Sequence, residues 1–191
     1  MIRFFDIILS LFGLFILLPV FTMVAIWIKL DSKGPVFYKQ TRVGRYGIDF
    51  KLFKFRSMLM DADKSGLLTV GGKDPRVTKS GYFIRKYKLD ELPQLLNVLS
   101  GEMSLVGPRP EVRKYVDMYT SEQQSILSIR PGITDWASIA FRNENEILGK
   151  SSDPEKTYIE DILPRKIEFN QIFIKNRTWW HYFKIILSTI F

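Results

Sequence analysis

The longest apolar stretch of the chain runs from Phe4 to Ile28 and is interrupted only by Asp6 and a few small or hydroxyl residues. A helix of that length can cross the hydrocarbon core of a bilayer. Pro19 lies near the middle of the stretch, where it removes a helix hydrogen bond and clashes with the preceding turn. The pattern therefore predicts a membrane helix that bends near Pro19.

The charges on either side of this stretch do not determine how the helix is oriented in the membrane. Arg3 precedes it, and Lys29 and Lys33 follow it, whereas a helix that crosses once usually has its basic residues on one side. Two arrangements stay open: a re-entrant helix that leaves on the side where it entered, and a simple span that tolerates its proline. A buried helix of a soluble protein fits the length less well.

The first part of the chain after residue 30 has the pattern of a β-hairpin. Val36–Gln40 and Phe50–Phe55 are typical of strands, and Gly44 and Gly47 between them supply turn positions.

Helical periodicity follows the hairpin. Leu92, Leu95, Leu96 and Leu99 recur on one helix face, and the pattern stops at Ser100-Gly101. A polar surface loop with a short helix is expected over residues 61–80, and further helices over residues 82–87, 111–128 and 153–175, the last interrupted near Pro164. The fold class is therefore α+β: a membrane helix, then one small helix-rich domain with a short β-hairpin.

The C-terminal segment is amphipathic. Trp179 and Trp180 stand beside Lys184 and an apolar run that is too short to span a bilayer. Paired tryptophans suit a helix that lies in the plane of the lipid headgroups. The alternative is a terminal helix docked on the protein core.

Composition narrows the classes of function. The formal net charge of +8 and the pI near 9.6 indicate an anionic partner. Nucleic acid is the weakest of the anionic candidates, because the basic residues are scattered and no zinc-finger or RNA-binding signature is present. The absence of Cys excludes disulfides and thiolate metal sites, and a single histidine, His181, excludes a histidine-based metal cluster.

Asp90-Glu91 is the strongest candidate for chemistry. Adjacent carboxylates can supply a nucleophile and a metal ligand side by side. Each residue also has a structural interpretation, because an Asp before an apolar helix is a typical N-cap and a first-turn Glu is favoured by the helix dipole.

Basic residues near the dyad make a phosphate site plausible on chemical grounds. Arg85 precedes Asp90 by about one and a half helical turns, and Arg109 is held between two prolines, which suits bidentate binding of a phosphate. Lys54 and Arg56 project to the same face of a strand by the period of two. Surface arginines and a solvated strand face are the alternatives.

At this point the sequence resembles a known family, the bacterial sugar transferases of the monotopic polyprenyl-phosphate phosphoglycosyl transferase type. The matching motifs are Phe55-Arg56-Ser57-Met58, Asp74-Pro75-Arg76-Val77-Thr78, Leu89-Asp90-Glu91-Leu92-Pro93-Gln94-Leu95, Gly101-Glu102-Met103-Ser104-Leu105-Val106-Gly107-Pro108-Arg109-Pro110-Glu111 and Pro131-Gly132-Ile133-Thr134. They cover most of the chain to about residue 140. The resemblance is to the minimal form of the family, with one membrane segment.

The resemblance implies a two-step reaction. Asp90 would attack the β-phosphate of a UDP-sugar and release UMP, and undecaprenyl phosphate would then take the phosphosugar, as the first membrane step of bacterial glycoconjugate or lipopolysaccharide assembly. Glu91 would bind Mg²⁺. Arg85 and Arg109 would contact phosphate groups, with Lys54 and Arg56 as weaker candidates.

The resemblance also implies a location. Residues 1–30 would form a re-entrant helix, and residues 31–191 a catalytic domain on the cytoplasmic face of the bacterial plasma membrane, with an interfacial C-terminal helix and no nucleic-acid partner. Whether the chain forms a homodimer is left open.

Two positions depart from the family pattern. Leu18 precedes Pro19, where many members have Ser, so the bend must be stabilised differently. Asp135 and Ser138 follow Pro-Gly-x-Thr, where many members have Gly and later Gln, and this bears on donor-sugar preference. Two other hypotheses remain: a single-displacement enzyme, and a membrane-anchored basic adaptor that binds anionic lipid or a partner enzyme.

Overall fold

The computed structural model of the chain describes residues 2–62, 66 and 74–190. Its α-helices and strands are α1 (Ile2–Asp31), β1 (Phe37–Val43), β2 (Asp49–Phe55), α2 (Lys79–Lys86), α3 (Gln94–Ser100), β3 (Ser104–Val106), α4 (Arg113–Val116), β4 (Gly132–Thr134), α5 (Trp136–Ala140), α6 (Glu144–Gly149), α7 (Pro154–Thr157), α8 (Leu163–Lys175) and α9 (Trp179–Ile190). Three short 3₁₀-helices in the described residues are η1 (Arg45–Gly47), η3 (Leu89–Glu91) and η4 (Gln123–Ser128), and a π-helical turn is η5 (Tyr158–Ile162). The predicted α+β class is confirmed.

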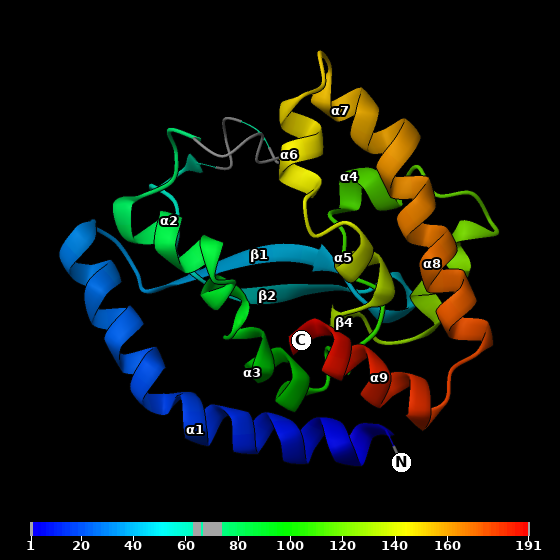
Figure 1. The fold of residues 1–191 in the computed structure, drawn as a ribbon, viewed down its shortest axis with the longest axis horizontal. Helices are drawn as coiled ribbons and strands as arrows, with labels where there is room; N and C mark the ends of the chain where they lie inside the picture. The colour runs from blue at the N-terminus through cyan, green and yellow to red at the C-terminus, as the bar shows by residue number, and fades with distance from the viewer. Residues whose placement is uncertain (1, 63–65, 67–73, 191) are drawn as a thin grey trace.

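The hairpin formed by β1 and β2 lies near the middle of the molecule, with α1, α2 and α3 on one side and α4 to α8 on the other (Figure 1). The two strands pair antiparallel from Phe37 opposite Phe55 to Val43 opposite Asp49. The predicted hairpin is therefore confirmed, with each strand slightly longer than expected. Between the strands, Gly47 has a φ of 74°, which a glycine adopts without strain.

Helix α1 is long and apolar enough to cross a membrane, by length and composition. It continues through Pro19, and Figure 1 shows it as a long bent helix along one edge of the molecule. The Thr22 hydroxyl donates to the Leu18 carbonyl at 3.0 Å, a contact that favours bending beside a proline. Most of its large apolar side chains face outward, since Phe12 and Phe15 are 62% and 79% exposed.

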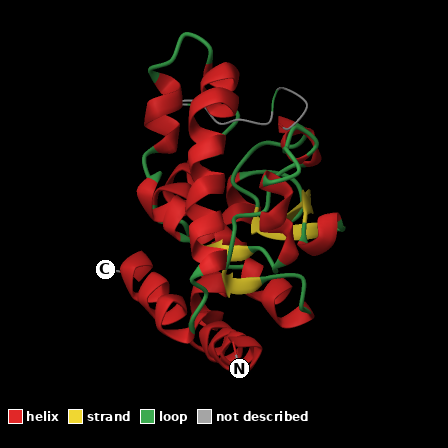
Figure 2. Ribbon diagram, turned by 90° about the vertical axis from the view of Figure 1, so that its right-hand side faces the viewer, coloured by secondary structure: helices red, strands yellow, loops and turns green. Residues whose placement is uncertain are grey.

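Polar side chains fix the N-terminal end of α1 to the rest of the protein. Arg3 donates to the carbonyls of Val98 and Leu99 at the end of α3. Asp6 is buried and accepts hydrogen bonds from the Ser104 hydroxyl at 2.9 Å and the Tyr182 hydroxyl at 2.8 Å. These contacts join α1 to α3, β3 and α9, and Figure 2 shows the start of α1 close to α9.

The C-terminal end of α1 is attached to the same domain. Asp31 accepts from the backbone N–H and the hydroxyl of Ser80 at the start of α2, at 2.9 and 2.8 Å. Arg56 donates to the carbonyls of Ser32 and Lys33. Buried Val24 and Ile28 pack close by in a cluster with residues of β2 and α2. Both ends of the apolar helix therefore contact one domain.

Two glycines bring β3 and β4 close together, with Ser104 opposite Gly132 and Val106 opposite Thr134 in a parallel pair. A Cβ at Gly132 would lie 2.1 Å from the backbone nitrogen of Gly107, and a Cβ at Gly107 would lie 2.5 Å from the carbonyl oxygen of Arg130. Only glycine fits such an approach. This contact sets the starting point of the loop that carries Arg109.

The predicted helix over residues 111–128 is wrong. The structure has only the single turn α4 and the turn η4 in that range. The Thr120 hydroxyl accepts from the Gln123 N–H, and the Gln123 side chain accepts from the Thr120 N–H. This reciprocal capping starts a new turn at Thr120 and so ends the preceding one.

The helical segment predicted over residues 153–175 is confirmed with its interruption. α7 passes through the π-turn η5 into α8, and Pro164 stands in the first turn of α8, where its missing N–H costs little. The helix predicted over residues 82–87 corresponds to α2. Half of the loop expected over residues 61–80, namely 63–65 and 67–73, lies outside the described residues.

Helix α9 has two different faces. Tyr182 and Ile185 are buried in a cluster with β3 and α8, whereas Trp179 and Trp180 are 55% and 69% exposed and stack with ring centroids 5.1 Å apart. Docking on the protein core explains the buried face of α9 only. That the exposed tryptophan face lies among lipid headgroups stays a prediction.

Candidate active site

The dyad lies in the turn η3 between α2 and α3. Lys88, just before it, adopts the left-handed conformation with φ 57° and ψ 20°, which turns the chain sharply and is rare for a residue other than glycine. Asp90 is buried at 7% exposure. Helix α3 begins only at Gln94, after Pro93 as its N-cap, so the helix-cap interpretation of Asp90 is wrong.

Glu91 is held by two basic side chains. Arg109 Nη1 donates to Glu91 Oε2 at 3.0 Å, and Arg109 Nη2 makes a short contact with Oε1, so the pair is bidentate. Lys54 Nζ lies 3.3 Å from Glu91 Oε1. Burial alone would raise the pKa of Glu91, but Arg109 and Lys54 hold that pKa well below its usual range. Glu91 is therefore firmly ionised.

Asp90 has the opposite electrostatic character. Burial raises its pKa, Lys54 lowers it, and the neighbouring Glu91 charge raises it again. The charges of Arg85 and Arg109 also lower the pKa of Asp90, which places both arginines within electrostatic reach. The site thus combines a fixed carboxylate with a buried one whose charge depends on the surrounding cations.

The backbone of Arg109 is positioned by Asp135. Asp135 is fully buried, and its Oδ2 accepts from the Arg109 N–H at 3.1 Å. Its Oδ1 accepts from the Ser138 N–H at 2.5 Å and so caps α5. From the sequence, the departure at Asp135 was expected to bear on donor-sugar preference, and this stays a prediction. The structure shows that Asp135 also holds the backbone of Arg109, the residue that pairs with Glu91.

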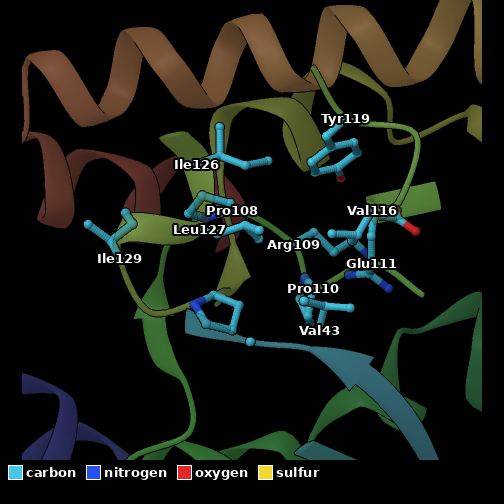
Figure 3. Close-up of a pocket in the computed structure, with 12 residues that line it drawn as sticks. Val43, Pro108, Arg109, Pro110, Glu111, Val116, Tyr119, Ile126, Leu127 and Ile129 are labelled. Carbon is cyan, nitrogen blue, oxygen red and sulfur yellow. The ribbon is translucent and has the colours of Figure 1, made fainter. Parts of the chain in front are cut away.

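Further contacts hold the loop on the other side of Arg109. Arg42 Nη1 donates to the Pro110 carbonyl at 3.1 Å and lies 3.5 Å from the Glu111 carboxylate. The Tyr158 hydroxyl donates to Glu111 Oε1 at 2.5 Å. Figure 3 shows the loop against Val43 and a small pocket of apolar side chains. Contacts on several sides leave the loop little freedom.

The other predicted phosphate contacts share one pocket but differ in their partners. Lys54, Arg56 and Arg85 line an open pocket of about 1330 Å³ together with the dyad and Arg109. The side chain of Arg56 is buried, and its guanidinium donates to the carbonyls of Ser32 and Lys33 just after α1. The strand ends at Phe55, so the alternation that linked Arg56 to Lys54 no longer applies.

The structure adds Lys88 and Asp135 to the site. Lys88 lines the pocket, and its charge lowers the pKa of Glu91. Its position two residues before Asp90 was the only signal in the sequence. Asp135 could have been found only as a departure within the Pro-Gly-x-Thr motif.

The carboxylates suit a metal ion only when a substrate supplies further ligands. No cluster of three or more His, Cys, Asp or Glu side chains able to hold a metal occurs in the part of the chain that the structure describes. Mg²⁺ usually binds one or two carboxylates and completes its shell with phosphate oxygens and water. Glu91 is ionised, but both of its oxygens are paired with Arg109 or Lys54, so it fits that kind of site only when a bound phosphate draws one of these basic groups away.

Comparison with known proteins shows what the whole chain resembles. The bacterial sugar transferase family matches residues 1–191. The UDP-N-acetylgalactosamine-undecaprenyl-phosphate N-acetylgalactosaminephosphotransferase of Aeromonas hydrophila is 38% identical over 188 residues, which are 97% of this chain and 41% of that protein. The UDP-glucose:undecaprenyl-phosphate glucose-1-phosphate transferase of Escherichia coli (strain K12) is 37% identical over 190 residues, 97% of this chain and 38% of that protein.

A third relative is the undecaprenyl-phosphate glucose phosphotransferase of Komagataeibacter xylinus, 38% identical over 199 residues, 98% of this chain and 35% of that protein. The chain therefore spans about two fifths of the length of these three curated relatives.

Proposed function

The chain belongs to the bacterial sugar transferase family, and from this premise we propose that it transfers a phosphosugar from a UDP-sugar to undecaprenyl phosphate. The names of two relatives share the UDP-activated donor and the undecaprenyl phosphate acceptor but differ in the sugar, which is N-acetylgalactosamine in one and glucose in the other. The sugar is therefore left unassigned. The observation that carries the proposal is the buried Asp90 beside the Glu91–Arg109 pair.

In the proposed first step, a carboxylate oxygen of Asp90 attacks the β-phosphorus of the UDP-sugar. The bond from that phosphorus to the bridging oxygen breaks, UMP leaves with the electron pair, and a phosphoglycosyl-aspartate forms. In the second step, a phosphate oxygen of undecaprenyl phosphate attacks the same phosphorus and frees Asp90. The product is an undecaprenyl diphosphate sugar.

The basic residues reduce the electrostatic repulsion between the two reacting groups. An anionic nucleophile approaches an anionic diphosphate, so positive charge is needed where negative charge builds up. Lys54, Arg85 and Arg109 line the pocket around Asp90. Glu91 keeps Arg109 and Lys54 in place as it pairs with both.

Mg²⁺ is the proposed cofactor. Glu91 would hold it, and the ion would neutralise the diphosphate and the departing nucleotide. The protein's own part is to hold Glu91 ionised through Arg109 and Lys54 and to keep Asp90 buried.

The proposed location is the cytoplasmic face of the bacterial plasma membrane, with α1 as a re-entrant helix. Arg3 and Asp6 at one end of α1 and Asp31 at the other all contact the same domain. A helix that crossed the bilayer once would separate these contacts. The apolar outer face of α1 supports burial in lipid between the two attachments.

The testing experiment measures UMP after purified protein is mixed with a panel of UDP-sugars and Mg²⁺, first without and then with undecaprenyl phosphate. The two-step reaction predicts about one UMP per protein before the acceptor is added, and continuous release afterwards. A single displacement predicts no UMP without the acceptor. Asp90→Asn should abolish release, whereas the exposed control Asp117→Asn should not.

The adaptor hypothesis makes a different prediction in the same experiment. A basic adaptor would bind anionic vesicles, release no UMP from any donor and show no dependence on Asp90. Absence of UMP release from the wild-type chain across the panel, together with vesicle binding, would replace the enzymatic proposal.

A further inference from the structure

The pocket that contains the dyad is also lined by polar side chains from elements across the hairpin from α1. They come from the loop after Arg109, from α5 and α6, and from η5 and α8, and Figure 1 shows α5 and α6 between the hairpin and α8. We call them the polar arm, and they are Glu111, Ser138, Glu144, Asn145, Tyr158 and Lys166. The proposed transfer step uses none of these side chains.

An ion pair joins two helices of the polar arm. Lys166 Nζ in α8 lies 2.7 Å from Glu144 Oε2 in α6, and the two side chains are only 10% and 25% exposed. Taking charges out of water costs free energy, and a buried pair can often be replaced by apolar residues without loss of stability. Fold stability is therefore a weak explanation for this pair, and its place on a pocket wall points to a ligand.

The wall of the pocket is continuous from Arg109 to this ion pair. Glu111 follows Arg109 by two residues, and its Oε1 accepts a hydrogen bond from the Tyr158 hydroxyl at 2.5 Å. Lys166 Nζ lies 5.3 Å from the centre of the Tyr158 ring. A group bonded to a phosphate beside Arg109 therefore has a path along this wall to Lys166 and Glu144.

Two uncharged polar side chains complete the arm. Asn145 is exposed at the pocket and carries an amide that can both donate and accept. Ser138 lines the same arm, and its hydroxyl oxygen is buried without a hydrogen-bond partner in the described part of the chain. Such a group needs an explanation, and a ligand in the arm supplies one. Ser138 is also among the departures from the family pattern, so this part of the arm is not shared by all members.

We propose that the polar arm binds the sugar ring of the donor and that Glu144 and Lys166 determine which sugar is accepted. The inference rests on the proposed function and extends it to the choice of donor. The hydroxyl and acetamido groups of a sugar both donate and accept hydrogen bonds. Glu144 supplies acceptors and Lys166 supplies donors. The two charges cancel, which suits a sugar without a charge of its own.

The chemistry of the donor requires the sugar to lie near the dyad. In a UDP-sugar the sugar is bonded directly to the β-phosphate, whose phosphorus Asp90 attacks in the proposed first step. The volume of about 1330 Å³ also exceeds that of an ordinary small-molecule site. A site that hydrogen-bonds a substrate hydroxyl rejects an analogue lacking it, because its own polar groups are then left unpaired. Glu144 and Lys166 can select a sugar in this way.

The test uses two variants of the pair and one matched control, all as full-length protein in nanodiscs. Glu144→Gln/Lys166→Met removes both charges together, so that neither is left buried alone. Glu144→Asp keeps the charge and moves the carboxylate back by one methylene group. The control, Lys114→Met/Glu155→Gln, removes an ion pair outside the pocket whose side chains are both 48% exposed.

Each protein is assayed for kcat and KM with the two best donors of the UDP-sugar panel, for UMP binding by calorimetry and for thermal unfolding. The double variant should raise the KM for the best donor about tenfold or more, the effect of losing hydrogen bonds to charged groups. Both Glu144 variants should change the ratio of kcat/KM between the two donors about fivefold or more. UMP binding should stay within about twofold of wild type, and the control should match wild type throughout.

Unchanged KM and an unchanged donor ratio in both Glu144 variants would overturn the inference. Equal weakening of UMP and of both UDP-sugars would also overturn it, because the arm would then hold the nucleoside or the pair would be only structural. Should the double variant unfold, Glu144→Asp decides alone. Absence of UMP release from the wild type with every donor would instead overturn the proposed function.

Discussion

Glu91 and Arg109 face each other as a bidentate pair, with Arg109 Nη1 donating to Glu91 Oε2 at 3.0 Å and Nη2 contacting Oε1. They are eighteen residues apart in the sequence. Their contact links the turn that carries the dyad to the loop between β3 and α4. The arrangement gives Glu91 a fixed charge and Arg109 a fixed direction.

Arg109→Lys should reduce kcat/KM for the UDP-sugar roughly 100-fold, the effect typical of losing one fixed donor at a centre of developing charge. Lysine keeps the charge but lacks the rigid planar fork that meets both Glu91 oxygens. Steady-state UMP release measures the effect. Arg113→Lys, at an exposed ion pair with Asp49, is the matched control, and an equal loss in both variants would contradict the role of the bidentate pair.

Asp135→Ala should lower kcat by about tenfold or more, because the Arg109 N–H loses its partner and the guanidinium is then less precisely placed against Glu91. Asp135 acts through Arg109, so the fall should appear in kcat more than in vesicle binding. Asp153→Ala removes another aspartate cap, at α7, far less buried. It should cost stability in thermal unfolding but leave kcat unchanged; a similar fall in kcat in both variants would mean that the effect is general destabilisation.

The rate of donor-only UMP release should fall in acid as Asp90 takes up a proton. Burial raises the pKa of Asp90, so its reactive carboxylate form is complete above that raised pKa and is lost as pH falls through it. The positive charge of Lys54 lowers the same pKa. Lys54→Met should therefore move the acid limb of the pH profile to higher pH.

The control for this shift is Lys51→Met, on the same strand, where the lysine is exposed and bonds Thr41. Its profile should match that of the wild type. An acid limb that stays in place in Lys54→Met would show that Lys54 does not act on Asp90.

Both ends of α1 should be accessible from the same side of a membrane. The chain has no Cys, so Ile2→Cys and Lys33→Cys each introduce a single reactive thiol. In sealed inverted vesicles, a membrane-impermeant maleimide should label both variants, and in right-side-out vesicles neither. Labelling of the two variants from opposite sides would establish a simple span and contradict the re-entrant arrangement.

The sequence predicts the parts of this fold that depend on local pattern. The hairpin, the end of α3 at Gly101 and the bend-prone apolar helix follow from periodicity, glycine and proline. The prediction of one helix over residues 111–128 was wrong, because it rested on apolar spacing and took no account of the capping pair Thr120 and Gln123. Local signals compete there, and the side-chain hydrogen bonds decide the outcome.

The candidate site shows a similar division. Asp90, Glu91 and Arg85 lie close in the sequence and could be linked by helical spacing, and the position of Arg109 between prolines marked it out. The role of Arg56 could not be inferred, because strand alternation holds only while the strand lasts and the end of α1 supplies its partners. Asp135 supports Arg109 through a contact across 26 residues, which no local pattern reveals.

Mass spectrometry of donor-treated protein tests the covalent step at Asp90 most directly. The protein is mixed with a reactive UDP-sugar without acceptor, and the reaction is quenched rapidly. The intact mass of the protein is then measured, and the protein is digested with trypsin. The predicted result is one added sugar phosphate on the tryptic peptide that follows Lys88, located at Asp90 and lost on addition of undecaprenyl phosphate. A modification at another residue, or none despite release of UMP, would contradict the mechanism.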